Sequence, residues 1–124
     1  MISRNRVLVA AASSLVVLIL LVNVHLASAH AVLLQSSPAV NSSVKGPDVA
    51  IRLRYNVRVE ASRCRLSLLL PDKSVKSVSI VQPSPDTLTA EAAGMLAGEY
   101  RLRWQVLASD GHITRGEIPF NVTP

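Results

Sequence analysis

The sequence predicts an all-β protein, a single β-sandwich that follows a cleaved signal peptide. Apolar and polar residues alternate with period two in several segments between residues 49 and 122, as in strands that are buried on one face. Turn-forming Pro, Gly, Asp and Ser residues separate these segments, and no stretch after residue 29 has convincing helical periodicity. About seven short strands in two packed sheets fit this pattern.

Residues 1–29 have the three-part layout of a secretory signal peptide. Two arginines precede an apolar run over residues 7–22, and Ala27-Ser28-Ala29 offers a small-residue cleavage site. An uncleaved membrane anchor is the alternative, because the extended run nearly reaches the roughly 20 residues that span a bilayer. We expect cleavage after Ala29, which leaves one exported domain over residues 30–124.

The first half of this domain supplies four of the expected strands. They cover residues 31–35, 49–56, 64–70 and 74–81. The stretch over residues 36–48 is rich in Ser, Pro, Asn and Gly and is expected to be a loop. Pro71-Asp72-Lys73 suits a tight reversal between the third and fourth strands.

The second half supplies three more strands, expected near residues 88–92, 100–106 and 118–122. Residues 82–86 are expected to break the pairing, because the prolines in this segment cannot donate to a sheet ladder. Trp104 is expected to anchor the core, and Gly116 to mark a bulge or an irregular strand start. An immunoglobulin-like or related Greek-key sandwich fits this order of elements.

Net charge and cysteine content bear on the possible partners of the protein and on the role of its cysteine. Loss of Arg4 and Arg6 with the signal lowers the formal net charge from +5 to +3, which gives little support for a nucleic-acid partner. Cys64 is the only cysteine, so the fold rests on its core and not on a disulfide. Its alternation with Leu66 and Leu68 favours packing in that core over a role as a metal ligand.

Two histidines remain after export, His30 and His112. Cleavage after Ala29 gives His30 both an imidazole and a free α-amine, whose pKa is ordinarily near 8. Asp110 lies two residues before His112, and Gly111 between them permits the bend that turns both toward one site. Three nitrogens and one oxygen suit Cu(II), with zinc as the main competitor. Separately, each residue also fits a plain role as a turn or loop residue.

Motifs at both ends of the domain carry a family resemblance. They are His30-Ala31-x-Leu33, Ser37-Pro38-Ala39, Gly98-x-Tyr100-x-Leu102-x-Trp104 and Ser109-Asp110-Gly111-His112 followed by Gly116. Together they bracket nearly the whole domain and resemble the CopC copper-resistance proteins. The resemblance implies a periplasmic β-sandwich without enzymatic activity. It further implies one Cu(II) per chain, bound by the N-terminal amine and by His30, Asp110 and His112.

The sequence departs from that family at two places. Many members hold Cu(I) on a Met-rich stretch, whereas Met95 is the only methionine after residue 29, so a Cu(II)-only form is expected. Related sequences often carry Ser-Glu near the positions of Asn56 and Val57, where the acidic residue is thought to support the site. Asn56 could still offer a hydrogen bond there, and Val57 could not.

Three functions remain open on this basis. The first is a periplasmic carrier or buffer of Cu(II) that could pass copper to an inner-membrane copper transport protein. The second is an oxidative enzyme with a histidine-brace copper site, and the third is a metal-free interaction module. Hydrolysis is disfavoured, because Ser109, Asp110 and His112 are neighbours on one turn and cannot form a relay. The protein is expected to be a monomer.

Overall fold

The computed structural model describes residues 30–124, and the predicted signal peptide lies outside this part of the chain. The described residues form nine strands and a short 3₁₀ helix, η1 (Ala61–Arg63). The strands are β1 (Leu33–Ser37), β2 (Ser42–Lys45), β3 (Val49–Tyr55), β4 (Arg65–Leu69), β5 (Val75–Val78), β6 (Val81–Ser84), β7 (Thr87–Ala92), β8 (Gly98–Leu107) and β9 (Ile113–Thr123). Over residues 30–124 we find no helix with the length and apolar character that a membrane span requires.

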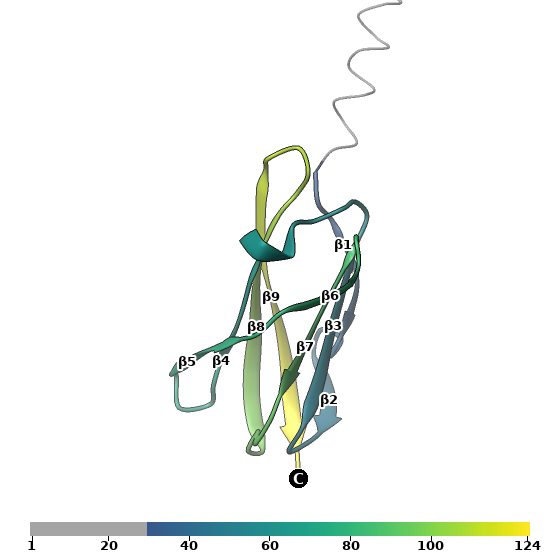
Figure 1. Cartoon of the computed structure of the whole chain (residues 1–124). Coiled ribbons are helices and arrows are strands. Elements are labelled where there is room, and N and C mark those ends of the chain that lie inside the picture. The colour runs from purple at the N-terminus through teal and green to yellow at the C-terminus, as the bar shows by residue number, and fades with distance from the viewer. Residues whose placement is uncertain (1–29) are drawn as a thin grey trace, which may run out of the picture.

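The strands form two sheets that pack face to face (Figure 1). One sheet has the order β1-β3-β7-β6 and the other the order β2-β9-β8-β4-β5. Neighbouring strands are antiparallel, except that β2 runs parallel to β9. The predicted all-β class and the two-sheet sandwich are therefore confirmed.

The core lies between the sheets and is built from the inward side of each alternating strand. In β3 the buried residues are Val49, Ile51, Leu53 and Tyr55, with more exposed residues between them, as the period-two pattern predicts. Trp104 is 9% exposed. Its indole meets the ring of Tyr55 edge to face at a centroid distance of 5.6 Å, so the expected core anchor is confirmed.

Cys64 is buried between η1 and β4, as its place among leucines predicts. Its Sγ donates a hydrogen bond to the Glu60 carbonyl at 3.0 Å. Burial is the main cause that raises the pKa of the Cys64 thiol above its usual value, and a protonated, buried thiol packs as a small hydrophobe.

Two strands lie in segments that the sequence predicted to be unpaired. β2 falls within residues 36–48, the expected loop, and pairs with β9. β6 overlaps the proline-rich segment over residues 82–86 and pairs with β7 at Val81 and Ser84, with an irregular register between them. The prediction of a single strand over residues 74–81 was likewise wrong, because β5 and β6 divide that stretch between the two sheets. An edge position such as that of β6 tolerates the missing N–H of Pro83.

The predicted irregularity at Gly116 was also wrong. β8 and β9 pair in continuous register from Gly98 opposite Val122 to Leu107 opposite Ile113, and Gly116 lies opposite Trp104. A Cβ at Gly116 would lie 2.8 Å from Trp104 Nε1. Glycine is therefore required by the close approach of the indole and not by a bulge.

Candidate metal centre

A tight turn between β8 and β9 holds Asp110 and His112 at one tip of the sandwich. The Ala108 N–H donates to the His112 carbonyl at 3.0 Å, and the Gly111 N–H donates to the Ala108 carbonyl at 2.9 Å. Gly111 has a φ of +87°, in the left-handed region that glycine adopts readily. The bend predicted at Gly111 is thus present.

Within the turn, the carboxylate of Asp110 orients His112. Oδ1 accepts a hydrogen bond from the His112 backbone N–H at 3.0 Å, and Oδ2 lies 2.8 Å from His112 Nδ1. The backbone hydrogen bond from His112 is the main cause that lowers the pKa of Asp110, so the carboxyl is an anion at neutral pH. With a proton on Nδ1 facing the carboxylate, Nε2 keeps its lone pair for a metal ion.

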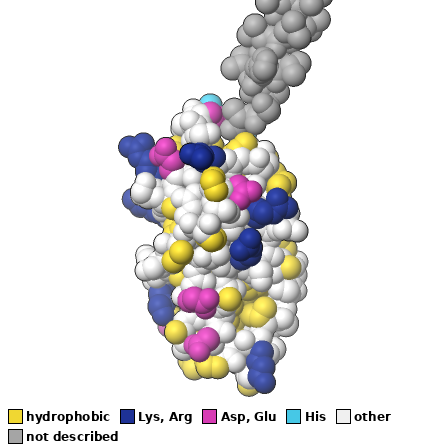
Figure 2. Space-filling view, turned by 45° about the vertical axis from the view of Figure 1, so that its right-hand side comes forward, with side chains coloured by type: hydrophobic (Ala, Val, Ile, Leu, Met, Phe, Trp, Pro, Cys, Tyr) yellow, Lys and Arg dark blue, Asp and Glu magenta, His cyan; other side chains and the backbone are white. Residues whose placement is uncertain are grey.

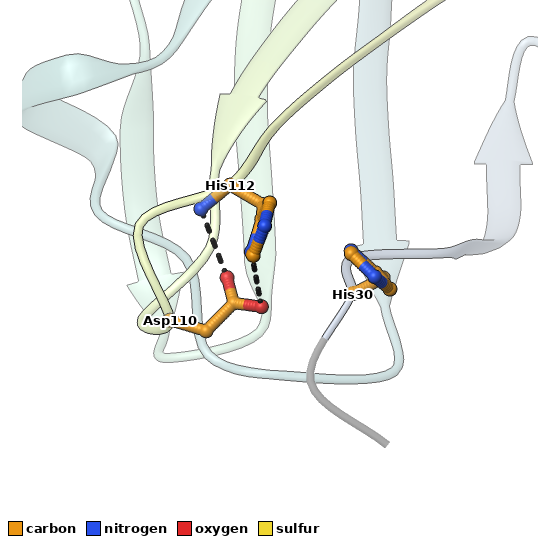
Figure 3. A group of neighbouring side chains, drawn as sticks. All are labelled: His30, Asp110 and His112. Carbon is orange, nitrogen blue, oxygen red and sulfur yellow. Dashed lines mark hydrogen bonds and ion pairs between the residues drawn. The ribbon is translucent and has the colours of Figure 1, made fainter. Parts of the chain in front are cut away.

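His30 reaches the same tip from the other end of the described chain. Its ring centroid lies 4.7 Å from that of His112, with the ring planes at 65°. Figure 3 shows the His30 ring across a short gap from the hydrogen-bonded Asp110 and His112. One ligand atom from each of the three residues lies within 4.8 Å of the others. All three residues predicted from the sequence are therefore brought together.

Contacts beside the sheet ladder hold His30 in place. β1 begins at Leu33, but Ala31 is already buried at 2% exposure. The Asn56 side chain accepts a hydrogen bond from the Val32 N–H at 2.7 Å and donates one to the His30 carbonyl at 3.1 Å. The sequence pointed to Asn56 as a hydrogen-bonding residue near the site. Its partners are backbone groups, which leave no signal in the residue pattern.

The cluster is open to solvent and is suited to a divalent transition metal. All three residues are exposed, and within residues 30–124 no other group of three or more His, Cys, Asp or Glu side chains converges in this way. The space-filling view shows histidine and acidic side chains together at the tip (Figure 2). Imidazole and carboxylate donors serve both copper and zinc, so the described side chains alone admit either metal.

Comparison with known proteins identifies the family. Residues 33–123 match the CopC domain. Protein YobA of Escherichia coli K12 is 29% identical over 98 residues, which cover 76% of this chain and 79% of YobA. The same similarity holds for Protein YobA of Shigella flexneri.

Solved structures of CopC-type proteins share the fold. The crystal structure of CopC from Methylosinus trichosporium OB3b is 29% identical, with a TM-score of 0.70, over 77% of this chain and 95% of that one. PcoC, a methionine-rich copper resistance protein from Escherichia coli, is 24% identical, with a TM-score of 0.62, over 77% of this chain and 100% of PcoC. Because the matched domain covers well over half of the sequence, the chain belongs to the CopC family.

Proposed function

We propose that this chain is a periplasmic Cu(II)-binding protein that carries or buffers copper in copper resistance or homeostasis. The observation that carries the proposal is the convergence of His30, Asp110 and His112, whose ligand atoms lie within 4.8 Å of one another. Membership of the CopC family and similarity to PcoC, named as a copper resistance protein, support copper as the cargo.

The proposed site holds one Cu(II) per chain on four donor atoms. Two come from His30, the α-amine and an imidazole nitrogen. The others are a carboxylate oxygen of Asp110 and Nε2 of His112. Three nitrogens and one oxygen suit the tetragonal geometry of Cu(II), which also has the highest intrinsic affinity among the common divalent ions. Zinc, which prefers tetrahedral sites, is the competing ion in any titration.

The amine donor depends on processing. In the full-length chain the His30 nitrogen belongs to a peptide bond with Ala29, and a peptide nitrogen has no lone pair comparable to that of an amine. Cleavage after Ala29 creates the fourth donor on the exported protein, which acts as a monomer. A carrier of this kind could hand its copper to an inner-membrane copper transport protein.

The first experiment titrates Cu(II) into the exported protein, after mass spectrometry has verified that it begins at His30. We expect a one-to-one complex with d–d absorption, which weakens on acidification because protons compete for the amine and imidazoles. His112→Ala should lose most of the affinity, whereas Ser109→Ala, in the same turn, should keep it. A processed wild-type protein that shows neither absorption nor thermal stabilisation with Cu(II) would exclude the function and leave the metal-free interaction module.

The second experiment compares the processed protein with a chain that begins at Ala29. One additional residue converts the His30 amine into a peptide nitrogen but leaves every side chain in place. We expect weaker Cu(II) binding by the extended chain. Equal affinity and an identical spectrum for the two chains would remove the α-amine from the ligand set.

An oxidative enzyme with a histidine-brace site is the second candidate, because its amine and two imidazoles match the same donors. Enzymes of that kind that act on polymers usually present exposed aromatic side chains to the substrate. Here Tyr55, Tyr100, Trp104 and Phe120 are all buried, at 1%, 4%, 9% and 4% exposure, and these are the only aromatic residues of the types Phe, Trp and Tyr in the chain. The carrier is therefore favoured. Oxidised sugars formed with copper and a reductant would reverse that preference.

A further inference from the structure

We propose that Asn56 is the positioning residue of the metal centre. Its carboxamide latches the backbone of residues 30–32 to the end of β3 and so holds the two His30 donors in place before copper arrives. This inference rests on the proposed function, since it concerns how the same site is kept ready for the ion.

Three hydrogen bonds make the latch. Asn56 Oδ1 accepts from the Val32 N–H at 2.7 Å, and Asn56 Nδ2 donates to the His30 carbonyl at 3.1 Å. The Asn56 backbone N–H also donates to the Val32 carbonyl at 3.1 Å. A carboxamide carries a donor and an acceptor in one planar group, so one side chain can bond both backbone groups at once.

The latch acts where the sheet no longer holds the chain. The first residue of β1 that pairs with β3 is Leu33, opposite Tyr55. His30 and Ala31 lie before that pair. The burial of Ala31 at 2% exposure fixes the middle of the segment, and the two side-chain bonds of Asn56 fix the groups on either side of it.

The hydrogen bond from Asn56 Nδ2 to the His30 carbonyl determines which parts of His30 remain free to rotate. Asn56 holds the carbonyl of His30 itself, and this carbonyl is joined to the same Cα that carries the α-amine and the imidazole. After processing, both donors are therefore separated from a fixed group by only a few rotatable bonds. Copper binding then loses less conformational entropy than it would with a loose terminus.

Asn56 acts through His30 and not on the metal, because both polar atoms of its side chain are hydrogen-bonded to backbone groups of Val32 and His30. Removal of an outer group that orients a ligand typically weakens metal binding about 10- to 100-fold. We expect Asn56→Ala to weaken Cu(II) binding about tenfold, with faster dissociation. We also expect an electron paramagnetic resonance spectrum with weakened nitrogen coupling from His30.

Asn56→Asp separates the two halves of the latch. An aspartate at this position keeps an acceptor for the Val32 N–H but, when ionised, has no donor for the His30 carbonyl. We expect its Val32 amide to stay protected from hydrogen exchange while its copper spectrum resembles that of Asn56→Ala. Asn121→Ala is the matched control, since Asn121 is an exposed asparagine in β9 and should leave both measurements unchanged.

A double-mutant cycle tests whether Asn56 affects Cu(II) affinity through His30. If Asn56 works by positioning the His30 donors, Asn56→Ala should cost less affinity in a His30→Ala protein than in wild type, because only the α-amine is then left to be held in place. Equal losses in both backgrounds, or a wild-type affinity and spectrum for Asn56→Ala, would overturn the inference.

Hydrogen exchange of the processed protein without copper distinguishes a failure of the Asn56 latch from a failure of the proposed function. The latch predicts that the Val32 amide is protected in wild type and exposed in Asn56→Ala, with or without copper. An unprotected Val32 amide in wild type would overturn the latch alone. A protected amide in a protein that does not bind Cu(II) would overturn the proposed function, and with it the role of the latch in metal binding.

Discussion

At the scale of single residues, Gly111 shows how backbone conformation shapes the candidate metal centre. Its φ of +87° lies in the left-handed region, and a Cβ built on Gly111 would meet no atom within 4 Å. The cost of a side chain at this position is therefore conformational and not steric. The same is true of Gly94, which has a φ of +66° and also meets nothing within 4 Å, but belongs to the turn before β8.

The comparison of Gly111 with Gly94 gives a prediction about the turn between β8 and β9. Gly111→Ala should lower the free energy of unfolding by about 1 kcal/mol, because alanine disfavours the left-handed conformation. It should also weaken Cu(II) binding, since the same bend aims Asp110 and His112. Gly94→Ala should have a similar effect on stability and none on copper. Thermal unfolding and Cu(II) titration measure the two effects, and equal copper affinities for both variants would contradict the prediction.

Tyr55 carries a buried polar group with no use in the fold. Within the described residues its hydroxyl is the one buried side-chain polar atom without a hydrogen-bond partner, and burial raises the pKa of Tyr55 above its usual value. The hydroxyl of Tyr100, by contrast, donates to the Leu96 carbonyl at 2.8 Å. An orphaned hydroxyl has lost its bonds to water without any compensation.

The two tyrosines should therefore respond oppositely to loss of the hydroxyl. Tyr55→Phe should leave the free energy of unfolding unchanged or raise it by about 1 kcal/mol, because the unpaired group is removed. Tyr100→Phe should lower it by about 1 kcal/mol, since a hydrogen bond is broken. Denaturant unfolding at neutral pH makes the comparison. A clear loss of stability in Tyr55→Phe would show that the hydroxyl has a partner after all.

Residue chemistry explains how much of the site was predictable. The imidazoles of His30 and His112 and the carboxylate of Asp110 were identifiable from residue type and from their places near the cleavage site and a turn. The latch by Asn56 was not predictable in detail, because its bonds go to backbone groups that every residue possesses. Val57, whose side chain the sequence analysis excluded as a hydrogen-bonding group, packs against the core.

At the scale of elements, strands with strict alternation were predictable, whereas the edge strands β2 and β6 were not. β3 and β8 were evident because one whole face of each is buried. β2 has only four residues, none of them fully buried, and it pairs with β9, far away in sequence. β6 has similar exposure and contains Pro83. Backbone hydrogen bonds to a neighbouring strand hold β2 and β6 in place, and the amino-acid composition of a strand does not reveal such bonds.

The pairing of β8 with β9 gives a prediction for Gly116. A Cβ at this position would lie 2.8 Å from Trp104 Nε1 and closer still to other indole atoms. Gly116→Ala should therefore displace the ring and lower the free energy of unfolding by about 1–3 kcal/mol. Trp104 is the only tryptophan, so its fluorescence reports the displacement directly. Unchanged fluorescence together with unchanged stability would contradict this account of the glycine.

At the scale of the whole molecule, carboxyl groups outside the metal centre link stability to pH. The Ser74 hydroxyl is the main cause that lowers the pKa of Asp72, the Thr87 hydroxyl lowers the pKa of Asp86, and Arg101 lowers that of Glu117. Each anion is favoured by the fold, so each stabilises the folded state above its unfolded pKa. That contribution disappears as the pH falls through the lower, folded pKa.

We therefore expect the apo protein to have a nearly constant free energy of unfolding from neutral pH down to about 5, and a declining one below about 4. Denaturant unfolding at pH 7, 5 and 3 tests this dependence. Replacement of Asp72 by Asn should flatten part of the decline, because the group no longer titrates. A free energy of unfolding that increases as the pH falls from 5 to 3 would contradict this prediction.

The direction of β9 separates the two ends of the domain. Its 11 residues start beside the metal centre and end at Thr123, and Figure 1 shows the C-terminus at the opposite end of the sandwich. At about 3.4 Å per residue, the strand places its two ends roughly 35 Å apart. A bead, an electrode or a dye attached through a linker after Pro124 would leave the tip that carries His30, Asp110 and His112 facing away from the support, so the proposed Cu(II) site would stay open to the solution.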